Sequence, residues 1–273
     1  METLTHRATA VDRSAVHRST QADVLVRTVE QLGDTTWNAH ISLPRSHWLN
    51  HPRPGRVPLT LMAETLRQAG MAVCTAGLGF DASVHFVISS MSLQTVPDLL
   101  VFPRFGALEA VLEVEFREVT LRRGVPHRLE VDYLLPGAGS GHVSAQVLAD
   151  RDYRAIRRNA AALADHLPQT AEDLLPGLRR RGATVTAGVG VDEADPFFFD
   201  HAVDHLPGML LLHSAVELHE RTVGRRPADV SISFPAFGEL GAATQLRAEV
   251  RGAVVASAFT QGGRLVAEAT TRG

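Results

Sequence analysis

The stretch DHAVDHLPGMLLLHSAVE, Asp200 to Glu217, places two histidine-containing turns before Pro207-Gly208 and then an apolar run that carries a histidine and a glutamate. Proline suits the position just before a helix, because its φ is fixed and its missing N–H is least needed there. The apolar run is too long for a typical strand and ends at Gly224. It therefore predicts a mostly buried helix.

A similar block lies 149 residues earlier in the chain. Leu59 to Gln68 (LTLMAETLRQ) aligns with Gly208 to Glu217 (GMLLLHSAVE), and Pro58 precedes it as Pro207 precedes the second block. The earlier apolar run continues to Gly77, so it predicts a second buried helix. This self-similarity indicates two structural repeats in one chain.

The segments around each helix also recur in the same order. Those after it alternate apolar and polar residues or run apolar, as strands do, and the last is preceded by a glycine-rich turn. The predicted strands of the first half are 23–30, 35–43, 83–93, 107–119, 127–135 and 141–150, and those of the second half are 182–191, 228–240, 244–253, 254–261 and 263–272.

A long helix wrapped by one antiparallel sheet is the hotdog architecture, and an isolated copy pairs with another to cover its exposed surface. The sequence thus predicts an α+β fold, a tandem double hotdog. We expect the first repeat over residues 1–151, a polar helical connector with a Pro-Gly stop over 152–180, and the second repeat over 181–273.

The bulk composition is that of an ordinary globular protein. A net charge of -3 gives no electrostatic footprint for nucleic acid. The lone Cys74 excludes an internal disulfide and fits a reducing cytosol. The polar N-terminus does not read as a signal peptide, and no apolar run reaches the ~18 residues of a membrane span. A cytoplasmic protein is expected.

The start of the second helix predicts a site for a carbonyl group. A helix that begins at Pro-Gly presents free N–H groups at its positive dipole end, here at Gly208 and Met209. Glycine allows close approach, so this end could polarise a thioester carbonyl. His201, on the preceding loop, and Glu64, from the first helix, could share that site and take a proton from an attacking group.

Structural roles for the same residues stay open. A histidine beside a helix start is more often a satisfied polar residue than a catalyst, and for His47, His205 and His213 neither reading is favoured. A glutamate inside an apolar run is harder to dismiss, because a buried carboxylate needs a partner. For Glu64 and His201 the functional reading is preferred.

Metal binding is not predicted. His201 and His205 are four residues apart, but Pro207-Gly208 argues against a helix there. His213 and Glu217 could share a helix face and ligate a cation together with Asp204, yet the strong clustered ligand pattern is missing.

The residues also resemble a known family. FFFDHAVDHLPGMLLL is similar to the helix entry of hotdog dehydratases that act on carrier-protein thioesters. The whole chain resembles the A-factor biosynthesis hotdog family, the AfsA-type γ-butyrolactone synthases. The resemblance rests on VHRS near the start, LPRSH at 43–47, AETLRQAG at 63–70 and DHAVDHLPGMLLL at 200–212.

This resemblance implies an acyltransferase. Family members transfer a β-ketoacyl group from an acyl carrier protein thioester, carried on phosphopantetheine, to the hydroxyl of dihydroxyacetone phosphate. The ester closes to a butenolide phosphate, a precursor of γ-butyrolactone or furan signalling molecules. Glu64 and Gln68 match the helix Glu and Gln of the dehydratases, and His201 matches their loop histidine. No bound cofactor is implied.

The sequence departs from the family pattern at several positions. His213 occupies the position equivalent to Glu64, Pro58-Leu59 replaces Pro-Gly in the first repeat, and His47 and His51 compete for the loop position. We therefore expect one competent site and one decayed or binding-only counterpart around His213.

The acceptor's phosphate would need arginines, because all 27 basic residues are arginine. Arg67 is the first candidate and Arg45 the second. Two alternatives remain: a hotdog dehydratase or thioesterase acting on acyl thioesters, and a non-catalytic protein that binds an acyl ligand. Either a monomer or a homodimer fits the fused repeats.

Overall fold

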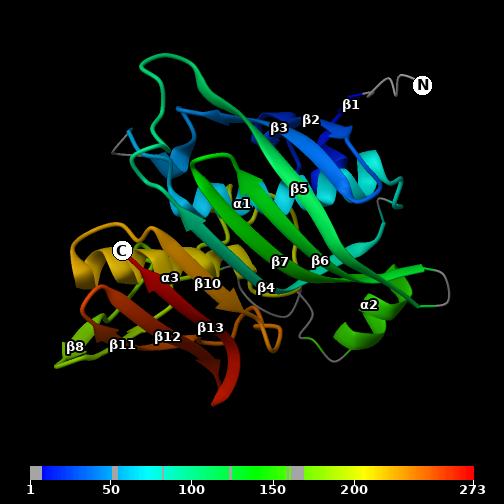
Figure 1. Cartoon of the computed structure of the whole chain (residues 1–273). Coiled ribbons are helices and arrows are strands. Elements are labelled where there is room, and N and C mark those ends of the chain that lie inside the picture. Colours follow the sequence, from blue (N-terminus) through cyan, green and yellow to red (C-terminus); the bar gives the residue numbers. More distant parts are fainter. Residues whose placement is uncertain (1–7, 51–54, 82, 123–124, 159, 161–168) are drawn as a thin grey trace, which may run out of the picture. The chain divides into compact units, whose positions relative to one another are not determined.

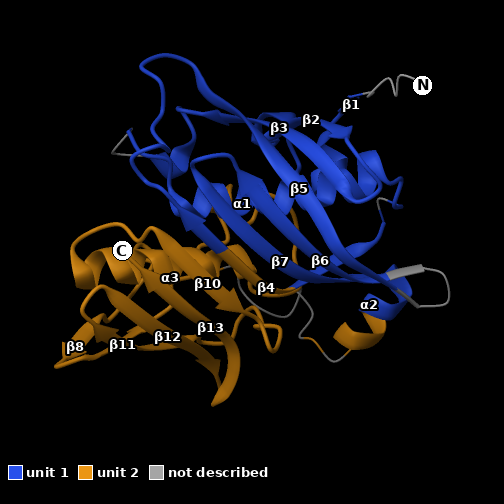
Figure 2. Ribbon diagram, viewed as in Figure 1, with its two compact units in different colours: residues 1–88, 93–153 blue, residues 89–92, 154–273 orange. Residues whose placement is uncertain are grey.

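The fold divides into two compact units (Figure 2). The computed structural model describes residues 8–50, 55–81, 83–122, 125–158, 160 and 169–273. Unit 1 comprises residues 1–88 and 93–153, and unit 2 comprises residues 89–92 and 154–273. Each unit contains one long helix and an antiparallel sheet (Figure 1).

Helix α1 (Leu59–Ala72) is the centre of unit 1. Pro58 is its N-cap, at the position predicted from the sequence. The helix is apolar on most of its circumference because it is surrounded by the core, where twelve of its 14 residues are buried. The chain then continues through one π turn, η4 (Val73–Gly77). The burial of each fully buried leucine, such as Leu61 or Leu66, contributes about 1.5–3 kcal/mol to the stability of the fold.

The sheet of unit 1 has the strand order β1-β2-β3-β5-β6-β7-β4. The paired neighbours from β1 to β7 run antiparallel. Three short 3-10 helices are also present: η1 and η2 lie between β1 and β2, and η3 lies between β3 and α1. Their bounds are η1 (Arg13–Val16), η2 (Gln21–Asp23) and η3 (Trp48–Asn50), and those of the strands are β1 (Thr9–Ala10), β2 (Val26–Gln31), β3 (Thr36–Pro44), β4 (His85–Thr95), β5 (Ala107–Arg122), β6 (Val125–Leu135) and β7 (Gly139–Leu148).

Unit 2 repeats this plan around helix α3 (Gly208–Val223). Pro207 is its N-cap, and Gly224 ends it in the left-handed conformation at φ 82°. The sheet order is β10-β13-β12-β11-β9-β8. Its strands are β8 (Arg179–Arg181), β9 (Thr184–Gly188), β10 (Asp229–Ser233), β11 (Gln245–Arg251), β12 (Val254–Gln261) and β13 (Arg264–Arg272).

The predicted fold class is confirmed. In β11 the buried side chains are Leu246, Ala248 and Val250, so every second residue points to the core, as the alternation in the sequence predicts. Four strands follow the helix in each unit, in the predicted order. Cys74 is buried, and burial raises the pKa of its thiol, as expected for a packed and inert group. Within the described residues, no helix has the length and apolar character needed to cross a membrane.

The helical connector predicted over residues 152–180 is described only in part by the structure. Helix α2 (Asp150–Arg157) begins earlier than expected and ends at Arg157. Residues 159 and 161–168 lie outside the described residues, and 169–178 form turns and irregular backbone. Pro176 and Gly177 suit a turn, and Arg179 already belongs to β8, which was not predicted.

Candidate functional site

A buried charged cluster surrounds Glu64 on α1. The carboxylate is fully buried, and its Oε1 accepts hydrogen bonds from Arg18 Nη2 at 2.7 Å and Arg67 Nη2 at 2.8 Å. Arg67 Nε donates to Oε2 at 2.8 Å. Gln68 Nε2 donates to Oε1 at 2.8 Å, while Gln68 Oε1 accepts from the backbone N–H of Leu25 at 2.7 Å. Both predicted helix residues, Glu64 and Gln68, thus belong to one network in unit 1.

These contacts keep Glu64 ionised. Burial by itself would raise the pKa of the carboxyl group, but the charges of Arg18 and Arg67 and the hydrogen bonds from Arg67 and Gln68 outweigh it. The pKa is therefore held far below its ordinary value. A carboxylate with so little proton affinity is a weak general base. Two guanidinium groups against one carboxylate leave this cluster with one positive charge.

The turn that follows η1 places the Arg18 side chain in this cluster. Asp12 caps η1 by accepting from the N–H of Ser14 at 2.9 Å. The chain then reverses at His17, the only described residue other than glycine with a positive φ, at 51°. This turn aims Arg18 into the core, where its side chain is 5% exposed.

His47 lies near the cluster at the end of β3. Its Nδ1 accepts from the backbone N–H of Leu49 at 3.3 Å, and Asn50 holds the same turn by donating to the carbonyls of Pro44 and Arg45. Burial and the nearby charge of Arg18 lower the pKa of His47 to about 4. The ring is therefore neutral at pH 7.

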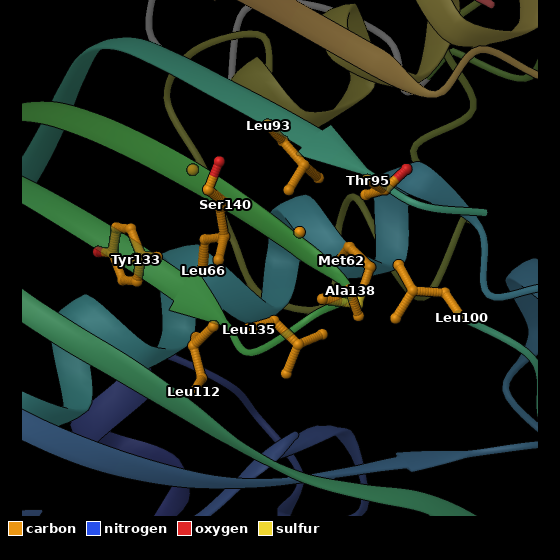
Figure 3. Close-up of a pocket in the computed structure, with 12 residues that line it drawn as sticks. Met62, Leu66, Leu93, Thr95, Leu100, Leu112, Tyr133, Leu135, Ala138 and Ser140 are labelled. Carbon is orange, nitrogen blue, oxygen red and sulfur yellow. The ribbon is translucent and has the colours of Figure 1, made fainter. Parts of the chain in front are cut away.

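An apolar pocket opens on the other side of α1 (Figure 3). Leu66 from the helix lies toward Leu112 near the Tyr133 ring at one end of the pocket, and Met62 lies beside Ala138 and Leu100 at the other. The free space between these side chains is small, about 10 Å³, close to the room that one water molecule needs. The remaining lining residues are Leu93, Thr95, Leu135, Ala138, Gly139, Ser140 and Gly141.

In unit 2 the loop before α3 carries two Asp–His pairs. His201 Nδ1 lies 2.5 Å from Asp200 Oδ1, and His205 Nδ1 lies 2.7 Å from Asp204 Oδ1. Because a carboxylate only accepts, Nδ1 is the donor, and the lone pair of each neutral ring is on Nε2. The His201 side chain is 50% exposed, whereas Asp200 is 5% exposed.

The start of α3 matches the sequence prediction in its backbone. Proline supplies no polar side chain to cap the first turn, so the N–H groups of Gly208 and Met209 face outward along the helix axis. The absence of a side chain at Gly208 has a packing reason, because a Cβ there would lie 3.1 Å from the Phe234 ring.

The remaining predicted residues have other surroundings. His213 is partly buried against the Phe198 ring, and burial lowers its pKa to about 4. Glu217 accepts from Arg221 Nε at 2.7 Å, as in an ordinary helix ion pair. Arg45 is exposed and donates to the carbonyl of Arg104. His51 lies outside the described residues.

No metal site is evident in the part of the chain that the structure describes, because no three His, Cys, Asp or Glu side chains gather there as ligands. Glu64 lies in unit 1 and His201 in unit 2. That they act in one site stays a prediction.

Two buried arginines, Arg18 and Arg157, were not predicted as site residues. Arg18 belongs to the VHRS segment, whose role the sequence left undefined, and Arg157 ends α2. A buried carboxylate at Glu64 requires a cation, so a search for its partner would have pointed to an arginine, although not to which one.

Comparison with known proteins is consistent with this architecture. A family model described as the A-factor biosynthesis hotdog domain matches residues 1–147 and again residues 145–273. A 2-oxo-3-(phosphooxy)propyl 3-oxoalkanoate synthase of Streptomyces coelicolor is 29% identical over 265 residues, with 89% of this chain and 83% of the relative covered. The enzyme of the same name from Streptomyces griseus is 28% identical, with 86% and 84% covered.

Solved structures share the fold at low sequence identity. An acyl-ACP thioesterase from Bacteroides thetaiotaomicron superimposes with a TM-score of 0.54 at 11% identity, covering 87% of this chain and 97% of that one. The 12:0-ACP thioesterase from Umbellularia californica gives 0.52 at 11% identity, with 89% and 98% covered. At this identity the likeness concerns the fold alone.

Proposed function

The chain belongs to the A-factor biosynthesis hotdog family, and we propose that it is an acyltransferase which moves a β-ketoacyl group from a thioester to the hydroxyl of dihydroxyacetone phosphate. The name of its relatives describes the product of such a transfer, an ester between a 3-oxoalkanoic acid and a phosphorylated oxopropyl group. Closure of the ester would give a butenolide phosphate. The proposed donor is a thioester on the phosphopantetheine arm of an acyl carrier protein.

One observation carries the proposal: helix α1 has an apolar pocket on one side and a cationic cluster on the other. Met62 and Leu66 line the pocket, while Glu64 and Arg67 belong to the charged cluster. An acyl chain requires apolar surroundings, and a phosphate requires guanidinium or ammonium donors. A group that binds phosphate is what transfer to a phosphorylated acceptor adds to simple thioester hydrolysis.

Arg67 is the proposed phosphate ligand. Its Nε and Nη2 are committed to Glu64, but its Nη1 donates to the Met71 sulfur at 2.9 Å, a weak acceptor that a phosphate oxygen can replace. The side chain is 18% exposed, more than that of Arg18 at 5%. Glu64 then serves to hold Arg67 in a fixed orientation, and proton transfer falls to another group.

His201 is the proposed base. Asp200 fixes the ring through Nδ1, so Nε2 can take the proton from the acceptor hydroxyl. The oxygen then attacks the thioester carbonyl, whose developing oxyanion is stabilised by the N–H groups at the start of α3. The C–S bond breaks, and the departing thiolate takes the proton from the imidazolium.

The test is a mass-spectrometric assay of purified protein with a β-ketoacyl thioester and dihydroxyacetone phosphate. We expect a phosphorylated ester or butenolide that needs both substrates. His201→Asn should abolish it, whereas His85→Asn, which removes another imidazole paired with an aspartate, should not. Arg67→Met should raise KM for the acceptor at least about tenfold. Thioester hydrolysis that ignores the acceptor would instead identify a thioesterase.

A further inference from the structure

Arg157, at the end of α2, makes four hydrogen bonds within unit 2. Its Nη1 and Nη2 donate to Glu239 Oε1 and Oε2, each at 2.8 Å, in a bidentate pair. Its Nε donates to Asp204 Oδ2 at 3.1 Å, and Nη2 also donates to the carbonyl of Asp204 at 2.5 Å. The side chain is 7% exposed. Paired fork geometry of this kind fixes direction as well as distance.

The contacts of Arg157 continue into the loop that precedes α3. Asp204 uses one oxygen for Arg157 and the other for His205 Nδ1 at 2.7 Å. The guanidinium lies over the Phe237 ring, 4.7 Å from its centroid, and the His205 ring meets the same ring edge-on at 5.1 Å. The imidazole is thereby restrained by a carboxylate and an aromatic face.

The loop that carries Glu239 is itself held by hydrogen bonds. Gln261 accepts from the N–H of Glu239 at 2.7 Å and donates to its carbonyl at 2.9 Å. The N–H of Leu206 donates to the carbonyl of Gly238 at 2.8 Å, which joins the two loops by their backbones. Arg157 thus connects the loop before α3 to the segment around Glu239, which is held by Gln261 at the end of β12.

We infer that Arg157 is a positioning residue for acyl transfer: it fixes Asp204, and through it the orientation of His205 and of the 200–207 loop that enters α3. This inference rests on the proposed function. Arg157 has no contact with the reacting groups in the described structure, so its effect is on geometry. A displacement of about 1 Å in such a loop can cost about 100-fold in rate.

A purely structural role for Arg157 predicts a different outcome, and Arg221 supplies the matched control. Arg221 is another arginine of unit 2 that bridges two carboxylates, Glu217 at 2.7 Å and Asp173 at 2.9 Å, although its side chain is 34% exposed and that of Arg157 only 7%. The partners of Arg221 lie outside the loop before α3. Arg157→Met and Arg221→Met therefore each remove an arginine that bridges two carboxylates, at different places in unit 2.

In the acyl-transfer assay, Arg157→Met should lower kcat about 100-fold with KM for both substrates changed less than about threefold. Arg221→Met should keep kcat within about threefold. Arg157→Lys should recover part of the loss, because an ammonium group can reach one carboxylate but not both. Equal losses of kcat in the two methionine variants would overturn the inference.

A second readout is independent of activity. In protein labelled with ¹⁵N-histidine, the signals of His205 are identified by their loss in His205→Gln. We expect the Nδ1-protonated tautomer in the parent protein and in Arg221→Met, and a tautomer mixture in Arg157→Met. An unchanged His205 spectrum in Arg157→Met refutes the inference even if the proposed reaction proves wrong. An inactive parent protein with the expected spectra refutes the proposed function alone.

Discussion

Replacing Glu64 with glutamine separates the two roles that this residue could have. The substitution keeps the size of the side chain and removes its charge, so Arg18 and Arg67 face each other without a compensating carboxylate. Their side chains are 5% and 18% exposed. The new amide also places donors opposite the Arg67 donors. Breaking a buried pair by removing one partner costs about 3–5 kcal/mol.

That cost corresponds to a large thermal shift. For a protein of 150–250 residues, 1 kcal/mol changes Tm by about 2–4 °C, so Glu64→Gln should lower Tm by about 6–20 °C. Thermal unfolding followed by circular dichroism measures the shift. Glu220→Gln is the control, because Glu220 pairs with Arg226 at 3.4 Å where both side chains are about one-third exposed. An exposed pair of this kind contributes about 0–1 kcal/mol.

The refuting result is equally definite. If Glu64 were the general base, Glu64→Gln would abolish acyl transfer at a temperature where the variant is folded, and its Tm would stay within about 2 °C of the parent value. That combination would show that the arginines do not depend on the carboxylate. A lowered Tm with residual activity of the folded variant supports the holding role instead.

Three further outcomes follow from the structure. Ala138→Leu fills the apolar pocket, so it should reduce turnover of long-chain donors more than that of short-chain donors. The same change at exposed Ala256 should leave the chain-length preference unchanged. Comparing kcat/KM across donors of different length measures both effects. The pKa of His213 is lowered from 6.5 to about 4, so between these pH values the unfolded chain binds a proton that the folded chain does not. The stability of the protein should therefore fall as the pH drops through this window. His213→Asn should make that fall shallower in denaturant titrations at pH 7 and pH 4.5. A Cβ at Gly70 would collide with the Tyr133 hydroxyl, so Gly70→Ala should destabilise the protein by about 1–3 kcal/mol, and adding Tyr133→Phe should recover most of the loss.

Local signals carried most of the fold prediction. Pro58 and Pro207 mark the helix starts and Gly224 marks a helix end, because each acts on its own backbone. Strand alternation is equally local, since it reports the pleat of one segment. The strand predicted over residues 228–240 was too long, because β10 ends at Ser233 and Pro235 follows two residues later, although Phe234 and Phe237 continue the apolar pattern.

The site was predictable only in part, for the opposite reason. The sequence indicates that Glu64 needs a cation, but its partner Arg18 is 46 residues away and reaches it through a turn at His17. Arg157 and Glu239 are 82 residues apart, and no pattern in either segment refers to the other. Long-range pairing of charges depends on the folded arrangement, which a motif does not encode.

The charged cluster on α1 also has a consequence for stoichiometry. At the equivalent helix positions, α3 carries His213, Val216 and Glu217 where α1 carries Glu64, Arg67 and Gln68. Two copies that began alike have therefore diverged in charge, and the later helix has kept the shape without the guanidinium. Titration with a phosphate-bearing acceptor should accordingly saturate at one equivalent per 29.5 kDa chain, half the number that the repeated architecture suggests.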